Sequence, residues 1–580
     1  MPEASSSRCR LSVPQRSSTT GNDRRRLRTH PRSSTAYHRS VTSRAPTQWN
    51  FADVWEMVAQ RLPAAPAQEH GERSWSWQEF DSRANGVAAA LLERGVARQD
   101  KIAQYLYNCP QYLESLFAAF KVGSAPVNTN YRYTDDELVY LWDNSDAVAV
   151  VFHATFTDTI DRIRDRVPGV RTWLWVDDGS HPCPSWALDY EEAASRSSVD
   201  SVRAPWGRSG DDLLLLYTGG TTGMPKGVMW RQEDLFLTLD STNKKRLPPE
   251  PDADALGDRY AKPGPKNLPA APLMHGTGLF NAMSNLMVGG CVVTLLGRRF
   301  DPEELLAAIE ARRVNSISIV GDAFAKPILR TLDANANRWD ISSLRVIVSS
   351  GVMFAAETKK GLLAHNERLI MVDALGSSEA IGMAQNTTTI DGASRTATFV
   401  LGPNTRVLTE DGREVQPGSD EVGRVALRGN TPIGYYKDPE KSAKTFEVID
   451  GVRWSIPGDW ARIDADGTVH LLGRGSQCIN TGGEKVFPEE VEESLKTHPS
   501  IADAAVVGLP DDRFGQSVTA LVELHAGHSI DEADVIGHVR RHLAAYKSPK
   551  RVLVVPSVNR ANNGKLDYRG LTDLAARLLG

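Results

Sequence analysis

Long apolar runs are missing from this sequence of 580 residues, and cysteine is scarce. No stretch approaches the roughly 18 to 20 consecutive apolar residues that a membrane-spanning helix needs, so no membrane anchor is encoded. The five cysteines are odd in number and far apart, and no Cys-x-x-Cys pair suggests zinc or thiol redox chemistry. These absences predict a protein of the reducing cytoplasm.

Acidic residues are scarce in the first 47 residues, which are rich in arginine and serine and include Arg24-Arg25-Arg26. Their only acids are Glu3 and Asp23, so this stretch is positively charged. The whole chain nevertheless has a formal charge of -5, so the rest of the chain must be acidic. We expect residues 1–47 to be a disordered extension, or to follow from a start codon assigned too early. Their composition also resembles a transit peptide, and a nucleic-acid-binding arm fits less well because the body does not share its charge.

Helical patterns alternate with short β-branched runs from Trp49 onward, which is typical of parallel sheets covered by helices. Capping-box spacing over 134–137 predicts a helix start, and residues 147–152 then read as a buried strand. The same order recurs with a helix start at Asp301 and a strand over 316–320. The class is therefore α/β, and the length predicts at least two domains.

The pattern changes near residue 475, where a short glycine-containing connector precedes a compact unit. This unit has a helix from Pro488, strands over 504–507 and 517–524, a helix from Asp531 and a strand over 551–555. We interpret it as a small α+β domain and the connector as a hinge.

The segment from Leu213 to Gly227 carries the clearest functional signal, because a buried strand leads into a run of glycines and threonines with one lysine. Glycines let the backbone approach a polyphosphate, while threonine hydroxyls and a lysine supply donors and positive charge to its oxygens. Pro225 and Gly227 flank the lysine where a Walker A loop needs Gly and Ser or Thr, which argues against a P-loop NTPase. The predicted phosphate-binding residues are Thr218, Gly219, Gly220, Thr221, Thr222, Gly223 and Lys226.

This segment resembles the phosphate loop of the adenylate-forming superfamily, which includes acyl-CoA synthetases, non-ribosomal adenylation domains and firefly luciferases. Further motifs follow in the family's order, so the resemblance covers about residues 50–570. It implies a large α/β N-terminal domain over 48–473, with parallel sheets covered by helices plus a β subdomain. A small mobile α+β C-terminal lid domain would follow over 474–580.

The resemblance implies roles for residues that surround ATP. Gly351 and Val352 stand where the family packs backbone on adenine, after a strand that we expect over 344–348. Gly376-Ser377-Ser378-Glu379 matches the next motif, in which Glu379, together with Thr218, would bind Mg²⁺, a cation that prefers oxygen ligands. Leu375 replaces the family's tyrosine, which would stack on adenine.

Later motifs imply the ribose contacts and the catalytic lysine. Asp459 stands where the family's aspartate accepts hydrogen bonds from both ribose hydroxyls, and Arg474 would contact ribose or phosphate from the hinge. Gly564-Lys565 matches the terminal motif, although the proline and threonine that usually precede it are absent. Lys565 is therefore the candidate catalytic lysine, acting with Lys226, Thr218 and Glu379.

The acid and CoA pocket is implied by three further positions. His275 stands in the segment beside the acyl and pantetheine pockets, and Gly482-Gly483 matches the loop that lets pantetheine pass. Gly321 belongs to a segment that resembles actinobacterial-type synthetases for long-chain fatty acids or steroid side-chain acids.

The resemblance therefore implies an acyl-CoA synthetase, an acid–thiol ligase that uses ATP, CoA and Mg²⁺ through an acyl-adenylate. Its partners would be small molecules, with neither nucleic acid nor a stable membrane anchor, and a homodimer stays open. Three alternatives remain: an acyl-AMP ligase that loads a carrier protein, a luciferase-like oxygenase and a non-catalytic nucleotide-binding homologue.

Overall fold

The computed structural model describes residues 49–580 except for 197–200, 221–222, 242, 244–258, 393–395, 482–483, 512–514, 544 and 562–563. At 219, 220, 223, 476, 484, 485 and 515 the description covers the backbone alone. Residues 1–47, the expected disordered extension, lie outside the described residues. Among the described residues, no helix combines the length and apolar character needed to cross a membrane.

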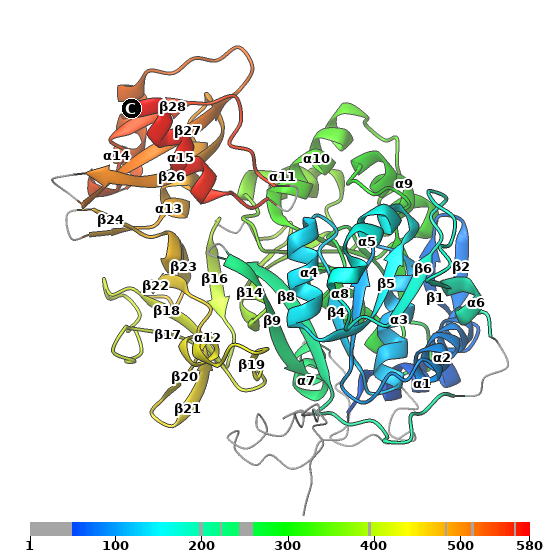
Figure 1. Cartoon of the computed structure of the whole chain (residues 1–580). Helices are drawn as coiled ribbons and strands as arrows, with labels where there is room; N and C mark the ends of the chain where they lie inside the picture. Colours follow the sequence, from blue (N-terminus) through cyan, green and yellow to red (C-terminus); the bar gives the residue numbers. More distant parts are fainter. Residues whose placement is uncertain are drawn as a thin grey trace, which may run out of the picture. The chain divides into compact units, whose positions relative to one another are not determined.

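The first sheet has eight strands in the order β19, β9, β8, β4, β3, β5, β6 and β7 (Figure 1). Their bounds are β3 Lys101–Tyr105, β4 Ala125–Asn128, β5 Ala147–His153, β6 Thr172–Val176, β7 Leu188–Asp189, β8 Leu213–Gly220, β9 Gly223–Arg231 and β19 Gly434–Tyr435. Six neighbouring strands pair in parallel, in the order β8, β4, β3, β5, β6 and β7. Strands β9 and β19 extend the sheet beyond β8 by antiparallel pairing. Strand β5 is buried along its whole length, as its apolar sequence predicts.

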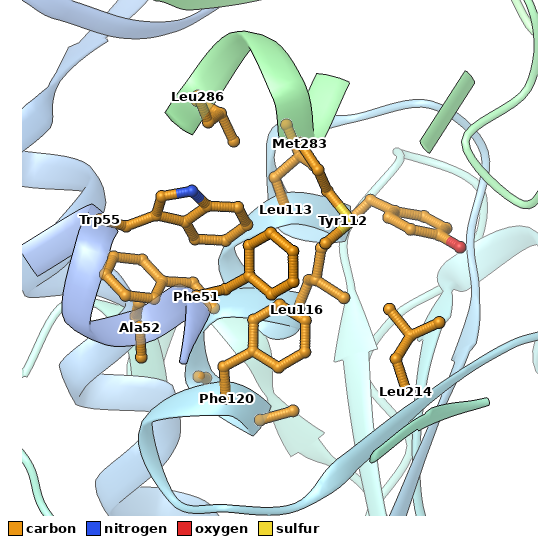
Figure 2. Close-up of a cluster of buried hydrophobic side chains, with 14 of the residues drawn as sticks. Phe51, Ala52, Trp55, Tyr112, Leu113, Leu116, Phe120, Leu214, Met283 and Leu286 are labelled. Atoms are coloured by element: carbon orange, nitrogen blue, oxygen red, sulfur yellow. The ribbon is translucent and has the colours of Figure 1, made fainter. Parts of the chain in front are cut away.

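An apolar cluster beside this sheet joins helices α1 (Phe51–Arg61), α3 (Pro110–Lys121) and α8 (Gly276–Met287). Figure 2 shows Phe51 and Trp55 of α1 facing Phe120 of α3 and Met283 of α8. The Phe51 and Phe120 rings stack with centroids 5.4 Å apart. Burial of each such side chain stabilises the fold by about 1.5 to 3 kcal/mol.

The second sheet has fifteen described strands, of which β1, β11, β10, β12, β13 and β14 pair in parallel in that order. From β15 onward the pairing is antiparallel, which gives the expected β subdomain. The bounds are β1 Pro66–His70, β2 Arg73–Ser76, β10 Lys266–Pro269, β11 Cys291–Thr294, β12 Ser316–Ile319, β13 Val346–Ser350, β14 Ile370–Ser377, β15 Ala380–Thr388, β16 Thr398–Leu401, β17 Thr405–Leu408, β18 Gly423–Arg428, β20 Phe446–Ile449, β21 Val452–Ser455, β22 Asp459–Ile463 and β23 Val469–Arg474.

The C-terminal segment forms a sheet of its own from β24 Ile479–Thr481, β25 Glu484–Val486, β26 Ile501–Asp511, β27 Gly515–Leu524 and β28 Arg551–Val554. Alternate residues of β26 face opposite sides, so Val506 packs with helices α13 (Pro488–Lys496) and α14 (Glu532–His542). Val507 instead packs with α15 (Tyr568–Leu579). The elements match the α+β pattern expected from sequence.

The remaining described α-helices are α2 Trp77–Glu93, α4 Asp135–Asn144, α5 Thr157–Ile163, α6 Tyr190–Ala194, α7 Gln232–Asp240, α9 Pro302–Arg312, α10 Gly321–Ala334, α11 Ala356–His365 and α12 Pro439–Thr445. The predicted capping box of α4 is present at Thr134, and the Asp301 side chain accepts from the Glu303 backbone N–H to cap α9. The strand expected over 344–348 begins and ends two residues later, as β13. It therefore includes Ser349 and Ser350, which continue the pairing with β14.

Candidate active site

Most of the candidate residues lie at or just after the carboxyl ends of strands. Gly321 follows β12, Gly351 follows β13, and Glu379 follows β14. These three strands are parallel neighbours in one sheet, so the segments that follow them meet at one edge. Ligands of open α/β sheets usually bind at this edge.

The glycine–threonine segment, which we expected to follow a buried strand, lies at the end of a β-hairpin. Thr218 pairs with Lys226 and Gly220 with Gly223, which leaves Thr221 and Thr222 outside the described residues. Leu214 and Leu216 before it are buried, and this anchors the hairpin in the core. The apolar half of the segment thus fixes the position from which the polar half projects.

Asn128, at the end of β4, ties the hairpin to the segment that contains His275. Its side-chain amide donates to the Tyr217 carbonyl at 2.8 Å and to the Met274 carbonyl at 2.7 Å. Its Oδ1 accepts from the Tyr217 backbone N–H at 2.5 Å. These three bonds fix the residues that immediately precede Thr218 and His275.

Glu379 is held by two hydroxyl groups. Its Oε1 accepts a hydrogen bond from Tyr435 Oη at 2.8 Å, and its backbone carbonyl accepts from Ser455 Oγ at 2.7 Å. The Lys226 ammonium lies 5.3 Å from the centroid of the same Tyr435 ring. Burial, and then the charge of Lys441, lowers the pKa of Lys226, while Glu379 opposes the shift. Burial raises the pKa of Tyr435, so its hydroxyl remains a donor.

Asp459 and Arg474 pair across β22 and β23, where Arg474 Nε donates to Asp459 Oδ1 at 3.3 Å. The charge of Asp459 is the main reason that the pKa of Arg474 lies above its ordinary value. Among the described residues, Asp459 Oδ2 is buried without a hydrogen-bond partner. An unpaired buried acceptor is costly, so this oxygen suits a donor such as a ribose hydroxyl.

Lys565 comes from the C-terminal segment, yet its charge acts on groups of the second sheet and of the segment before α8. The surrounding protein lowers the pKa of Lys565, Arg474 lowers it further, and Glu379 and Asp459 oppose the shift. The side chain itself stays accessible to water. Burial, and then the charge of Lys565, lowers the pKa of His275 to about 4. The structure therefore brings Lys565 together with Glu379, Asp459, Arg474 and His275.

Gly321 allows a close contact with the expected adenine segment. Its φ is +48°, and a Cβ there would lie 2.3 Å from the Met353 carbonyl oxygen and 2.6 Å from that of Val352. Its backbone N–H donates to Ser349 Oγ at 3.0 Å. The glycine thus packs against the backbone that follows β13, and this contact is its direct role in the fold.

Comparison with known proteins identifies the family. The model of the AMP-binding enzyme family matches residues 55–436, and that of the AMP-binding enzyme C-terminal domain matches 490–565. The chain belongs to the AMP-binding enzyme family. Among its relatives is the medium/long-chain-fatty-acid–CoA/3-oxocholest-4-en-26-oate–CoA ligase of Mycolicibacterium smegmatis, 39% identical over 90% of this chain and 96% of that protein. The 3-oxocholest-4-en-26-oate–CoA ligase of Rhodococcus rhodochrous is also 39% identical, over 90% and 95%.

The solved structures support the fold of this AMP-binding enzyme. The crystal structure of ATP-bound MatB from Rhodopseudomonas palustris shares 26% identity, with a TM-score of 0.75 over 92% of this chain and 100% of that one. The resemblance expected from the sequence motifs, and the fold that it implied, are thus confirmed.

The motif around Glu379 and the glycine pair of the C-terminal segment stand differently in the structure of this AMP-binding enzyme. Leu375, which replaces the family's tyrosine, packs in the apolar cluster of the β subdomain with 8% of its surface exposed. Gly376 sits where a Cβ would lie 3.0 Å from the Ala380 carbonyl oxygen, and Ser377 Oγ accepts from the Glu379 backbone N–H at 3.2 Å. Ser378 contributes its carbonyl, which accepts from Trp230 Nε1 at 2.9 Å. Gly482 and Gly483 lie outside the described residues.

Sequence reasoning missed Tyr435 and Asn128 in this AMP-binding enzyme. Tyr435 contacts both Glu379 and Lys226, but it lies far from either in sequence and only a Gly-Tyr-Tyr segment marks it. Asn128 ends an apolar strand, where a buried amide is unusual and could have been noticed.

Proposed function

We propose that the protein is an acyl-CoA synthetase that converts ATP, a carboxylic acid and CoA to acyl-CoA, AMP and diphosphate through an acyl-adenylate. The observation that carries the proposal is the group of cations, Lys226, Arg474 and Lys565, around Glu379 and Asp459. These cations can bind the oxygens of one polyphosphate, and the unpaired oxygen of Asp459 can accept from a ribose hydroxyl. Both features fit a nucleoside triphosphate.

The first step needs no general base, because a carboxylic acid with a pKa near 4 is ionised at neutral pH. Its oxygen attacks the α-phosphorus, an acyl–phosphate bond forms, and the bond to the diphosphate breaks. Lys226 and Lys565 neutralise charge that develops on the phosphate oxygens, and the backbone at 218–220 and 223 would position these oxygens. Catalysis in this step is therefore electrostatic.

A magnesium ion fits the acidic side of this group. Glu379 is partly exposed and keeps a carboxylate oxygen beyond the one bonded to Tyr435, and Thr218 supplies a hydroxyl. Among the described residues there is no cluster of three or more His, Cys, Asp or Glu that could hold a metal. This agrees with Mg²⁺, which commonly uses one or two carboxylates plus phosphate oxygens. When bound, the ion would neutralise phosphate charge.

In the second step the CoA thiol attacks the acyl carbonyl, a thioester forms, and AMP and a proton leave. We propose that residues 474–580 act as a lid domain that turns between the steps, with 48–473 as the fixed domain. Lys565 would then withdraw, Gly482 and Gly483 would let pantetheine pass, and His275 would line the pocket. The lowered pKa of His275 keeps its ring neutral, which suits an apolar acid and a thiol.

The acid is proposed to be a long-chain fatty acid or a steroid side-chain acid, as the names of the relatives indicate for those proteins. Each methylene buried in an apolar pocket contributes on the order of 0.8 kcal/mol, so such a pocket favours a large acid. We further propose a cytoplasmic location, where ATP, CoA and reduced thiols coexist.

The decisive experiment measures AMP release with ATP and CoA across acetate, benzoate, palmitate and a C24 or C27 steroid acid. We expect turnover to rise steeply toward the large acids and to require CoA. Best turnover on acetate or benzoate would overturn the substrate proposal. Adenylate formation without thioester formation would favour an acyl-AMP ligase, and no adenylate with any acid would overturn the enzyme function itself.

A further inference from the structure

Lys565 lies in an irregular segment between β28 and α15, so neither a helix nor a strand fixes its position. Two backbone bonds close a turn here: the Gly564 N–H donates to the Ala561 carbonyl at 2.7 Å, and the Ala561 N–H donates to the Lys565 carbonyl at 2.9 Å. Local bonds shape a turn but do not fix its position relative to the rest of the domain. Another contact must attach it to the sheet.

Arg560 supplies that contact. Its Nη1 donates to the Gly564 carbonyl at 3.2 Å, immediately before Lys565. The same guanidinium donates to both carboxylate oxygens of Asp503, from Nε at 2.6 Å and from Nη2 at 3.0 Å. Nη2 also donates to the Ala504 carbonyl at 3.0 Å. One planar group thus bridges the lysine-bearing turn and strand β26.

The anchor lies within the β26–β27 strand pair. Asp503 is paired with Glu523 in the β26–β27 ladder, and Ala504 is fully buried. The side chains of Arg560 and Asp503 are each 24% exposed, so the pair is partly shielded from water. An arginine guanidinium is planar and has five N–H donors in fixed directions, so it can donate to a carboxylate and a carbonyl at the same time. A lysine ammonium cannot reproduce that geometry.

The position of the turn matters because its far side packs against the earlier part of the chain. Gly564 has a φ of +74°, and a Cβ there would lie 2.8 Å from a Val352 methyl and 3.3 Å from Ala323 Cβ. The turn therefore lies against the proposed adenine segment with little spare room. A misplacement of about 1 Å can cost on the order of 10²-fold in rate.

We propose that Arg560 is a positioning residue that holds the turn so that Lys565 reaches the proposed nucleotide site, with Asp503 as its anchor. This inference rests on the proposed function only for the expected change in adenylation rate. The placement of Lys565 can be measured without turnover. Arg560 itself touches neither nucleotide nor acid. Its effect is confined to the step that uses Lys565.

The test compares Arg560→Lys and Asp503→Asn with a matched control, Arg551→Lys, which changes an exposed arginine paired with Glu532 in the same domain. Adenylation is measured as diphosphate release, and thioester formation is measured separately from prepared acyl-AMP and CoA. We expect Arg560→Lys to lower adenylation by about 10- to 100-fold, with thioester formation within about twofold of the parent. Asp503→Asn should give a smaller loss in the same step, and Arg551→Lys none.

A double variant separates positioning from general damage. If Arg560 acts through Lys565, then Arg560→Lys should have almost no further effect on adenylation in a Lys565→Ala background, because the two changes remove one function. A full additional loss in that background, or an equal loss in both half-reactions, would overturn the inference.

A measurement that needs no turnover distinguishes a failure of this inference from a failure of the proposed function. Competitive labelling of Lys565 with acetic anhydride across pH, followed by mass spectrometry, reports the pKa of its amine. The lowered pKa of Lys565 in the parent should return toward its ordinary value in Arg560→Lys, because the turn leaves its surroundings. An unchanged labelling midpoint would overturn the inference. A shifted midpoint in a protein that activates no acid would support it while overturning the proposed function.

Discussion

The hydroxyl of Tyr435 donates a 2.8 Å hydrogen bond to Glu379 Oε1 and joins a strand at the edge of one sheet to the end of a strand in the other. The Lys226 ammonium lies over the same ring. Tyr435 therefore links the proposed metal ligand to the proposed phosphate-binding lysine. Such a link should orient the carboxylate before any ligand arrives.

Tyr435→Phe keeps the ring and removes that hydrogen bond. Hydrogen bonds to charged groups contribute about 1.5 to 3 kcal/mol, so we expect kcat/KM for adenylation to fall by roughly 10- to 100-fold. The Mg²⁺ concentration for half-maximal rate should rise as well. Glu379→Gln is the reference variant and should abolish Mg²⁺-dependent diphosphate release. A Tyr435→Phe enzyme with parental rates at all Mg²⁺ concentrations would contradict this role.

Lys565→Ala tests the division of labour between the two steps. We expect adenylate formation to fall by about two to three orders of magnitude, the scale of losing one preorganised charge contact. Thioester formation from prepared acyl-AMP and CoA should stay close to the parental rate. Quenched-flow measurement of both half-reactions decides the question, and equal losses would mean one fixed site.

Gly321→Ala should damage the proposed adenine segment. The new methyl group would meet two backbone carbonyl oxygens at a φ of +48°, so the backbone at 352–353 must shift. We expect a higher KM for ATP and a lower thermal midpoint. Gly537→Ala is the control, because that glycine lies within α14 and a Cβ there would only contact the Arg541 side chain, at 3.7 Å, so alanine should be neutral or stabilising. Parental KM and stability in Gly321→Ala would refute the packing argument.

Glu492→Gln should change the pH dependence of stability. Burial, and then repulsion from Glu489, raises the pKa of Glu492 to about 8, while its Oε1 accepts from the Val506 N–H and the Tyr568 hydroxyl. Because the folded-state pKa lies above the unfolded value, the stabilising contribution is complete below about pH 4.5 and is lost as pH rises through 8.

The Glu492→Gln variant lacks this titration and keeps an oxygen for both donors, so its thermal midpoint should exceed that of the parent at pH 9 by more than at pH 6. Calorimetry at both pH values measures the difference. Glu440→Gln, at an exposed ion pair with Lys444, serves as the control and should show no such trend. A constant difference between Glu492→Gln and the parent would contradict the raised pKa.

Sequence patterns predicted most of the elements that position the site. The strand over 504–507 and the helix starts at Thr134, Asp301 and Pro488 depend on neighbours within a few residues, and the structure confirms them. The glycine–threonine segment was recognised by composition, but its hairpin pairing was not, because polar residues in a strand carry no period signal. The predicted end of β13 was two residues early for the same reason, because the strand continues through the polar residues Ser349 and Ser350.

By itself, the sequence determined the α/β class, the family resemblance and the identity of Lys226, Glu379, Asp459, Arg474 and Lys565 as candidates, because each lies in a local motif. Only the tertiary structure decided what surrounds them. The Tyr435 contact with Glu379, the Arg560 bridge to Asp503 and the packing of Gly564 on Val352 join residues between 56 and over 200 positions apart. Such contacts arise when separate sheets and turns pack together, and no local pattern of side chains encodes which distant partner a hydroxyl or guanidinium will meet.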